Sequence, residues 1–272
     1  MIVNVYDVGH GFCGYVRDGI TGANLLIDCG YNEHTGVHPA EGVVAEYGRI
    51  GGLVIQNYDE DHVDGLPRLL ARLGPCPVSV LYGNPTITPA QILALKTPPY
   101  GDGILALLQI KARYTAPMAG GGAPGECYIS QYWNPYPWVD NTNDLSLVTF
   151  VHGPGYSVLF AGDLEGPGWR WLLWNPAFRS ELARVKVYVA SHHGRTTGYC
   201  AEVFEHCRPA VVIISDGEIQ YETQAHCYAQ HASGIPWGEG QVRRVLTTRR
   251  DGDIRISPGL GYAGLITTSA AA

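Results

Sequence analysis

The sequence contains a series of short apolar runs, and each run ends in polar residues or glycines. The runs span residues 2–8, 24–27, 52–55, 156–161, 185–190 and 210–215. β-Branched residues are frequent in them and they are too short for helices, so they are predicted to be buried strands. Helical spacing of apolar residues appears between them, for example at 39–49 and 64–73. This alternation predicts an α/β protein with its chemistry at one edge of a sheet, where the strand ends gather.

Composition supports a globular chain. Hydrophobic residues make up 46% of the 272 residues and charged residues 16%, which is enough to bury a sizeable core. We expect a single domain over residues 1–266 and a disordered tail over 267–272. The formal net charge of -7 argues against a protein that coats nucleic acid by bulk charge. This negative charge does not exclude an enzyme that binds a few phosphate groups through metal ions.

The cysteines do not form a recognisable metal or disulfide framework. There are 7 of them, an odd number, and none lies in a Cys-x-x-Cys pair. Buried free thiols in a reducing compartment are the simpler interpretation. The N-terminus lacks the pattern of a signal peptide, and no apolar run approaches the ~18 residues of a membrane helix. We therefore expect a cytoplasmic protein with no membrane partner.

The most informative stretch is Asn-Tyr-Asp-Glu-Asp-His at 57–62, between the strand 52–55 and the helix 64–73. It places three carboxylates and one imidazole in a tight turn. Like charges this close repel one another, and a bound cation relieves the repulsion. The alternative is a helix cap whose acidic side chains are solvated.

Other strand ends carry further candidate ligands. Asp163 follows the run 156–161, and His192 and His193 follow the run 185–190. With the turn, they make a candidate set for one or two divalent cations, consisting of Asn57, Asp59, Asp61, His62, Asp163, His192 and His193. Each residue alone is weak evidence, because a His-His pair is more often a surface or core feature. His10 and Asp28 are expected near the same edge, although Asp28 is equally well explained as a turn-forming residue.

Seven motifs occur in an order that resembles a known family. They are Asp-Val-Gly-His-Gly at 7–11, Leu-Ile-Asp-Cys-Gly at 26–30, the turn at 57–62, Asn-Asp-Leu-Ser-Leu-Val at 143–148, Ala-Gly-Asp-Leu-Glu at 161–165, Ser-His-His-Gly at 191–194 and Thr-Arg-Arg-Asp-Gly-Asp-Ile at 248–254. The set resembles the metallo-β-lactamase superfamily, and within it the hydrolase domain of the DNA-uptake protein ComEC. The resemblance implies a four-layer αββα sandwich with metal ions at one edge of its two sheets.

The resemblance also implies roles for particular residues. Asp163 matches the aspartate that bridges two ions, and Asp61, His62 and one of the two histidines at 192–193 match the ligands of the second ion. The first ion normally takes histidines, whereas this chain has Asn57, Asp59 and the 141–143 turn there. Oxygen donors favour Mn²⁺ or Mg²⁺ over Zn²⁺. The cofactor is therefore expected to be one or two divalent ions, either Mn²⁺ or Zn²⁺, with Mg²⁺ as a further option.

The function implied is hydrolysis of a phosphodiester, in a nucleic acid or a small nucleotide, by water that a metal ion activates. The same motifs imply that catalysis uses Asp59, Asp61 and His193, and that substrate binding uses Arg195, Asn143 and His10. Arg195 is about equally well explained as a solvated surface charge. Two alternatives stay open: a hydrolase of another ester, and a degenerate, non-catalytic binding protein with the same fold.

Overall fold

The computed structural model describes residues 1–75, 77–115, 127–217, 222–238, 240–257 and 265–269. Its first sheet has 7 strands. In spatial order they are β15 (Leu265–Thr268), β14 (Ile254–Ser257), β1 (Ile2–Val5), β2 (Gly14–Arg17), β3 (Asn24–Ile27), β4 (Ile50–Val54) and β5 (Val78–Tyr82). Strands β3, β4 and β5 are parallel, and the other neighbours are antiparallel.

The second sheet has 6 strands. In spatial order they are β13 (Val245–Thr247), β10 (Val211–Ile214), β9 (Val185–Val189), β8 (Tyr156–Phe160), β7 (Val148–Gly153) and β6 (Tyr128–Tyr132). Strands β8, β9, β10 and β13 are parallel, and β6, β7 and β8 are antiparallel. A small separate ribbon pairs β11 (Ile235–Trp237) with β12 (Gln241–Arg243).

The two sheets pack face to face, and the alternation of side chains along each strand separates the cores. In β3, Leu25 and Ile27 point into the core between the sheets, whereas Leu26 points to the outer helices. In β8, Phe160 lies between the sheets and Leu159 faces outward. Successive residues of a strand point to opposite faces, so strands that are apolar on both faces become the two middle layers.

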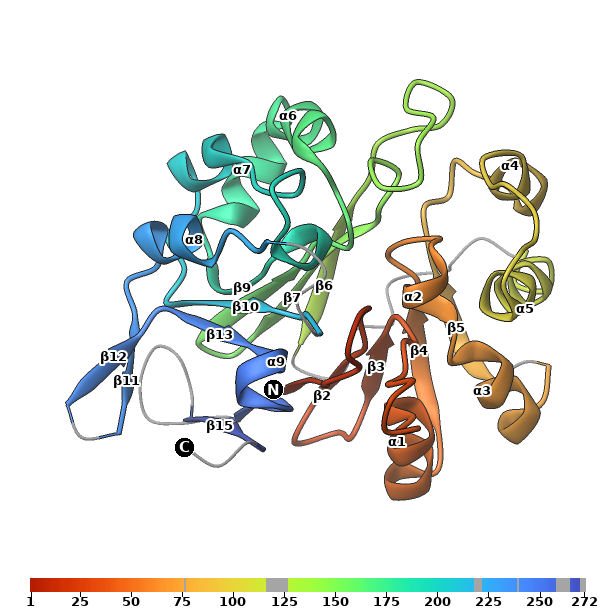
Figure 1. Ribbon diagram of the computed structural model, residues 1–272, viewed down its shortest axis with the longest axis horizontal. Coiled ribbons are helices and arrows are strands. Elements are labelled where there is room, and N and C mark those ends of the chain that lie inside the picture. Colours follow the sequence, from red (N-terminus) through yellow and green to blue (C-terminus); the bar gives the residue numbers. More distant parts are fainter. Residues whose placement is uncertain (76, 116–126, 218–221, 239, 258–264, 270–272) are drawn as a thin grey trace.

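Helices cover both outer faces (Figure 1). The first sheet is covered by α1 (Pro39–Tyr47), α3 (Leu66–Leu73) and α5 (Asp102–Lys111), with α4 (Pro89–Ala94) beside them. The second sheet is covered by α6 (Gly166–Leu173), α7 (Pro176–Leu182) and α8 (Ala225–His231), together with the 3₁₀ turns η1 (Ser191–Gly194) and η2 (Ala201–Glu205). This arrangement confirms the predicted four-layer αββα sandwich.

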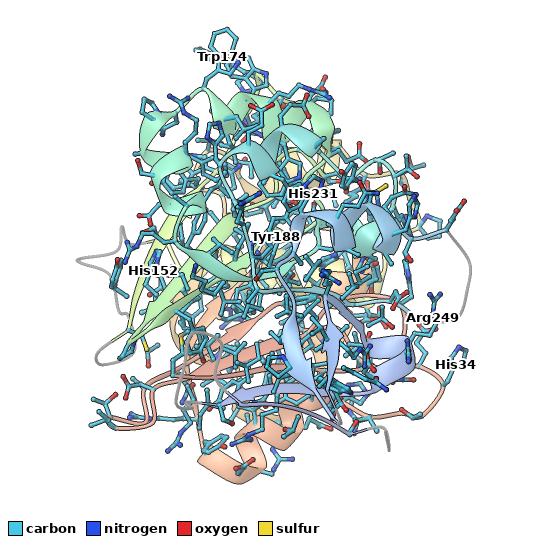
Figure 2. All side chains as sticks on the ribbon, turned by 90° about the vertical axis from the view of Figure 1, so that its left-hand side faces the viewer. His34, His152, Trp174, Tyr188, His231 and Arg249 are labelled. Atoms are coloured by element: carbon cyan, nitrogen blue, oxygen red, sulfur yellow. The ribbon has the colours of Figure 1, made fainter. Side chains whose placement is uncertain are left out.

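The outer helical layer of the second sheet is rich in aromatic residues. Tyr188 of β9 is buried and packs against Trp169, whereas Trp174 is 82% exposed at the far surface (Figure 2). The aromatic stretch near residue 130 divides between two environments: Tyr132 packs on Phe150, and Trp138 is 75% exposed. Part of this aromatic stretch therefore packs in the core and part lies at the surface.

Two sequence-based expectations about the C-terminal region need correction. The turn residues Asp251 and Gly252 predict a hairpin between strands at 243–248 and 253–257. In the structure β13 pairs with β10, β14 pairs with β1, and α9 (Thr248–Asp251) separates them. The predicted tail was expected to begin at Thr267, but Thr267 and Thr268 pair with β14. Residues 270–272 lie outside the described residues.

Within the described part of the chain, no helix has the length and apolar character needed to cross a membrane.

The segment around the 57–62 turn differs slightly from its prediction. The expected strand is present as β4, but two helices follow it, α2 (Glu60–Val63) and then α3. Asp64 does not cap α3, because Gly65 holds the N-cap position. The Asp64 carboxylate instead accepts a hydrogen bond from the backbone N–H of Tyr31 at 3.1 Å. The turn is therefore anchored to the loop that follows β3.

Candidate metal centre

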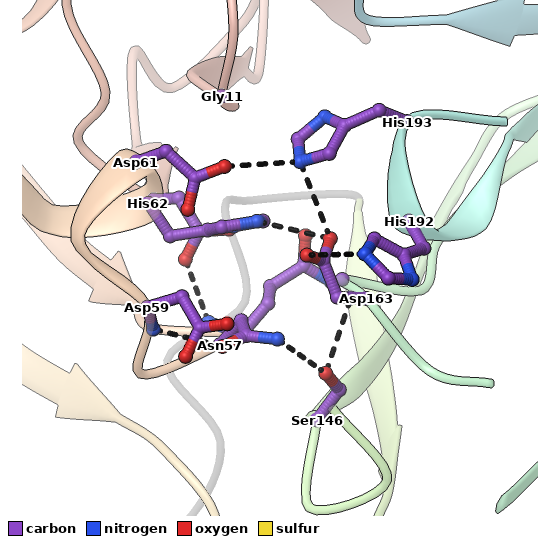
Figure 3. Close-up of polar contacts among 12 residues, drawn as sticks. Gly11, Asn57, Asp59, Asp61, His62, Ser146, Asp163, His192 and His193 are labelled. Atoms are coloured by element: carbon purple, nitrogen blue, oxygen red, sulfur yellow. Dashed lines mark hydrogen bonds and ion pairs between the residues drawn. The ribbon is translucent and has the colours of Figure 1, made fainter. Parts of the chain in front are cut away.

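The carboxyl ends of parallel strands bring the predicted site residues together. Strands β3 and β4 are parallel, and Asp28 and the 57–62 turn follow them. In the other sheet β8 and β9 are parallel, and Asp163 and the turn η1 follow them. Side chains from these strand ends converge on one centre (Figure 3).

His62 is held between two carboxylates. Its Nδ1 lies 2.7 Å from Oδ2 of Asp28, and its Nε2 lies 3.0 Å from Oδ1 of Asp163 (Figure 3). Asp28 is fully buried, and its Oδ1 also accepts the backbone N–H of Gln56 at 2.7 Å. Its positive φ of 55° is unusual for a residue other than glycine. Asp28 therefore orients the imidazole so that Nε2 points into the centre.

His193 points a buried ring nitrogen at two carboxylates of the centre. Its Nδ1 contacts the carbonyl oxygen of Ser215 at 3.0 Å, and among the described residues its buried Nε2 has only carboxylates within ion-pair distance and no well-aligned hydrogen bond. That Nε2 lies 3.3 Å from Oδ2 of Asp61 and 3.6 Å from Oδ1 of Asp163 (Figure 3). Ligand atoms of His62, Asp163 and His193 lie within 4.8 Å of one another. A buried nitrogen that faces carboxylates in this way fits a metal ligand.

The backbone around His193 is strained. His192 and His193 have φ values of 49° and 52°, in the left-handed region. Such a conformation costs of order 1–3 kcal/mol per residue and persists only where the surroundings enforce it. Here the backbone N–H of His192 donates to the carbonyl of Gly162 at 3.0 Å, and Gly198 packs against the carbonyl of Ser191. The left-handed backbone therefore directs the side chains of His192 and His193 toward different neighbours.

Close backbone contacts fix Asp61. A Cβ on Gly11 would lie 2.2 Å from the carbonyl oxygen of Asp61, and a Cβ on Gly30 would lie 2.8 Å from the same atom. The N–H of Phe12 donates to this oxygen at 3.2 Å. The glycines of the two N-terminal motifs therefore allow these loops to pack directly on the 57–62 turn.

His192 lies beside the cluster rather than in it. Its Nε2 accepts a hydrogen bond from Arg195 at 3.0 Å and lies 3.9 Å from Oδ2 of Asp163. Its Nδ1 lies 3.1 Å from Oε1 of Glu165. Because a guanidinium can only donate, His192 is neutral with its proton on Nδ1. Arg195 also donates to Nε2 of His10 at 3.0 Å. The structure thus joins Arg195 and His10, two predicted substrate-binding residues.

His10 completes a second group of possible ligands. Its Nε2 lies 3.3 Å from Oδ2 of Asp61, and ligand atoms of His10, Asp61 and His193 lie within 4.8 Å of one another. The His10 side chain is 38% exposed, which makes it the most accessible imidazole of the centre. His193 belongs to both groups, so it stands at their junction.

Asn57 and Asn143 form a structural amide network. The Asn57 Nδ2 donates to Oδ1 of Asn143 at 3.1 Å and to Oγ of Ser146 at 3.3 Å, while its Oδ1 accepts the backbone N–H of Asp59 at 2.9 Å. Asn143 in turn donates to Oε1 of Glu165 at 3.3 Å. These bonds explain why a fully buried amide is stable at this position.

Asp59 lies at the opposite side of the centre from His193, next to a lysine. The Lys96 ammonium contacts Oδ1 of Asp59, and the Thr142 hydroxyl donates to the same oxygen at 3.0 Å. Neither group of possible ligands includes Asp59. Nothing local in the sequence predicted the contact with Lys96, because 37 residues separate the two.

The pKa values follow from burial and from the close charges. Burial raises the pKa of Asp163, but the charges of His62 and His193 outweigh it and lower that pKa to about 2. Burial likewise opposes ionisation of Asp61, yet contact with His193 and the charge of His62 hold its pKa below the ordinary value. For His62, burial disfavours protonation, but Asp163 and Asp28 raise its pKa well above the ordinary value. Without a metal ion the centre therefore pairs ionised carboxylates with protonated imidazoles, and a cation bound there would take the place of those protons.

The fold and the centre together define a class. Two mixed sheets between helical layers, with polar side chains gathered at one edge, form the metallo-β-lactamase fold. The structure of the metallo-β-lactamase fold protein YhfI from Bacillus subtilis matches this chain with a TM-score of 0.51 at 11% sequence identity, over 98% of this chain and 99% of that one. At this identity the similarity establishes the fold and not the activity.

Matches with lower scores include Zn²⁺-bound PqqB from Methylobacterium extorquens, with a TM-score of 0.41 at 12% identity over 70% of this chain and 72% of that one. The short form of human tRNase Z matches with a TM-score of 0.43 at 14% identity, over 82% of this chain and 95% of that one. No protein-family model matches the sequence. No curated protein matches it significantly.

Proposed function

We propose that this protein is a metal-dependent hydrolase that cleaves phosphodiester bonds. The observation that carries the proposal is the buried Nε2 of His193, which lies 3.3 Å from the Asp61 carboxylate and 3.6 Å from the Asp163 carboxylate. His62 directs a second imidazole nitrogen at Asp163. These four side chains offer two imidazole and two carboxylate ligands, a set that suits Zn²⁺ or Mn²⁺.

A divalent ion bound here would supply a water of lowered pKa and would polarise the ester. The chain's own residues do the rest. Asp28 keeps the proton of His62 on Nδ1, which leaves Nε2 as a ligand atom. Asp61 and Asp163 are ionised at neutral pH in the metal-free centre, where protonated histidines lower their pKa values, and a bound cation would favour the same ionised state. His10 is the most accessible imidazole of the centre, and it is assigned the role of donating a proton to the leaving oxygen.

Positive charges beside the cluster support an anionic substrate. Arg195 lies between the imidazoles of His10 and His192, and Lys96 lies beside Asp59. A guanidinium matches the geometry of phosphate oxygens. Arg195 is therefore proposed to bind a non-bridging oxygen of the phosphodiester. Only a few cations are involved, which favours a small nucleotide or a short stretch of nucleic acid over a long polymer in a chain with a net charge of -7.

Elemental analysis of the purified protein, followed by hydrolysis of bis-p-nitrophenyl phosphate with added Mn²⁺, Mg²⁺ or Zn²⁺, tests the proposal. Bound metal and turnover that is lost in Asp163→Ala, with an unchanged circular dichroism spectrum, are expected. Metal binding without turnover on this or a carboxylic ester probe would contradict hydrolase activity.

One observation favours a second candidate, a non-catalytic binding protein. The Asn57 amide is used in structural hydrogen bonds and Lys96 contacts Asp59, so this side of the centre lacks the donors expected for a metal ion. A protein that binds a nucleotide in the presence of metal but leaves it intact would be this second kind.

A further inference from the structure

We propose that the centre holds a single divalent ion, and that the ammonium group of Lys96 occupies the position beside Asp59 where another ion was expected. The inference rests on the proposed function for its ion, but it concerns a different part of the site. It also assigns Lys96 a role that no motif indicated.

The first step is the position of Lys96. Its side chain is 15% exposed, and its ammonium group contacts Oδ1 of Asp59. It lies two residues beyond the end of α4, and its backbone N–H bonds to the carbonyl of Leu93 at 3.2 Å. The start of α4 is fixed by a reciprocal capping interaction between Thr88 and Gln91. Lys96 is therefore presented by an anchored segment.

The second step is the chemistry of Asn57. Both hydrogen-bond directions of its Nδ2 are used, toward Asn143 and Ser146, and its Oδ1 accepts the N–H of Asp59. An amide nitrogen has no lone pair to offer a cation. Oδ1 is the one atom of Asn57 that could bind a cation. In this orientation it accepts the backbone N–H of Asp59 instead.

The third step concerns the remaining donors that the sequence suggested for another ion. Asn141 is bonded to Asp144 through its Oδ1 and its Nδ2, so it stabilises its own turn. His192 accepts Arg195 at Nε2 and presents Nδ1 to Glu165. Asp59 is the one carboxylate left in this set, and Lys96 lies against it.

The fourth step is electrostatic. The ammonium group of Lys96 contacts Oδ1 of Asp59, and the negative charge of Asp163 attracts it as well. A dication placed between the same carboxylates would be repelled by the ammonium group at short range. The ammonium group of Lys96 can instead supply part of the positive charge that this ion would provide, because its three N–H donors can bind an anionic oxygen. The chain therefore needs only the ion held by the cluster around His193.

The experiment counts ions and does not depend on turnover. Apo protein is titrated with Mn²⁺ and with Zn²⁺ in a calorimeter, and bound metal is measured by elemental analysis after dialysis. Wild type and Asp59→Asn are each expected to bind one ion per chain, and His193→Ala none. Lys96→Ala is expected to admit another ion at saturation, whereas the charge-retaining Lys96→Arg is expected to bind it at least tenfold more weakly than Lys96→Ala. Circular dichroism confirms that each variant is folded.

Different outcomes separate this inference from the proposed function. Two ions in wild type, whether or not one is lost in Asp59→Asn, would overturn the inference and leave the hydrolase proposal intact. A single ion in Lys96→Ala at saturation would overturn the exclusion by Lys96. No ion in wild type under any condition would overturn both.

Discussion

The Nδ1 atom of His62 lies 2.7 Å from Oδ2 of Asp28, and both side chains are almost completely buried. The contact joins the carboxyl ends of two neighbouring strands, because Asp28 follows β3 and His62 follows β4. It fixes the tautomer of an imidazole whose other nitrogen faces Asp163. Asp28 thereby determines how His62 can act, although it lies outside the ligand cluster.

We therefore expect Asp28→Asn to weaken metal binding by about 10–100-fold, since an amide cannot keep His62 in the same tautomer as strongly as a carboxylate. Competition with a chromogenic chelator measures the affinity. Asp18→Asn is the matched control, because Asp18 is also buried but accepts the N–H groups of Ile20 and Thr21 in the turn after β2. Equal losses of affinity in the two variants would contradict the role of Asp28.

The adjacent histidines are expected to behave differently. His193→Ala removes the nitrogen that faces Asp61 and Asp163, so it should abolish metal binding in equilibrium dialysis. His192→Ala should keep the ion, because the Nε2 of His192 is occupied by Arg195. A protein that loses its ion in His192→Ala and keeps it in His193→Ala would reverse the assignment.

Arg195→Lys is expected to raise the KM for a phosphodiester about tenfold and to leave metal content unchanged. A hydrogen bond to a charged group contributes about 1.5–3 kcal/mol, and lysine cannot bond both imidazoles and a phosphate with the same geometry. Steady-state kinetics provide the measurement. Arg170→Lys is a suitable control, because Arg170 forms an exposed ion pair with Glu202 on the outer surface. An unchanged KM in Arg195→Lys would indicate that Arg195 is structural.

Gly11→Ala tests the close backbone contact with Asp61. The added Cβ would lie 2.2 Å from the carbonyl oxygen of Asp61, at a φ of 123°. We expect a loss of more than about 3 kcal/mol in the free energy of unfolding, and weaker metal binding, because the turn must shift. Gly36 has a φ of 69°, but no atom of the described residues lies within 4 Å of an added Cβ, so Gly36→Ala should cost only about 1–2 kcal/mol. Denaturant unfolding compares the two.

The apo protein should lose stability as the pH rises from about 4 to about 7 because of Asp64. Burial is the main reason that its pKa rises from 3.8 to about 7 in the folded state, and Asp61 and Glu60 add to this effect. Across this window the folded chain retains a proton that the unfolded chain has lost, so protonation favours folding at low pH and this contribution disappears above pH 7.

Asp64→Asn should therefore be more stable than wild type at pH 8 and close to wild type at pH 4, since asparagine can still accept the N–H of Tyr31. Urea unfolding at both pH values, with a chelator present, provides the measurement. An equal difference in stability at the two pH values would contradict the shifted pKa of Asp64.

Much of the fold was predictable because its signals are local. Runs such as Leu25–Ile27 and Val158–Phe160 are apolar on both faces, and this pattern is sufficient to predict buried strands between layers. The order of the sheet neighbours was not predictable. Pairing of β1 with β14 joins residues about 250 positions apart, and the local sequence of Asp251–Gly252 suggested a hairpin instead.

The sequence alone determined which chemical groups are available: Asp61, His62, Asp163 and the two histidines at 192–193 stand at predicted strand ends, where side chains can meet. Only the tertiary structure decided how they are used. It directs His193 into the cluster and His192 to Arg195 through a left-handed backbone, and it brings Lys96 onto Asp59. These outcomes depend on packing between segments distant in the sequence, and short-range patterns carry no information about such packing.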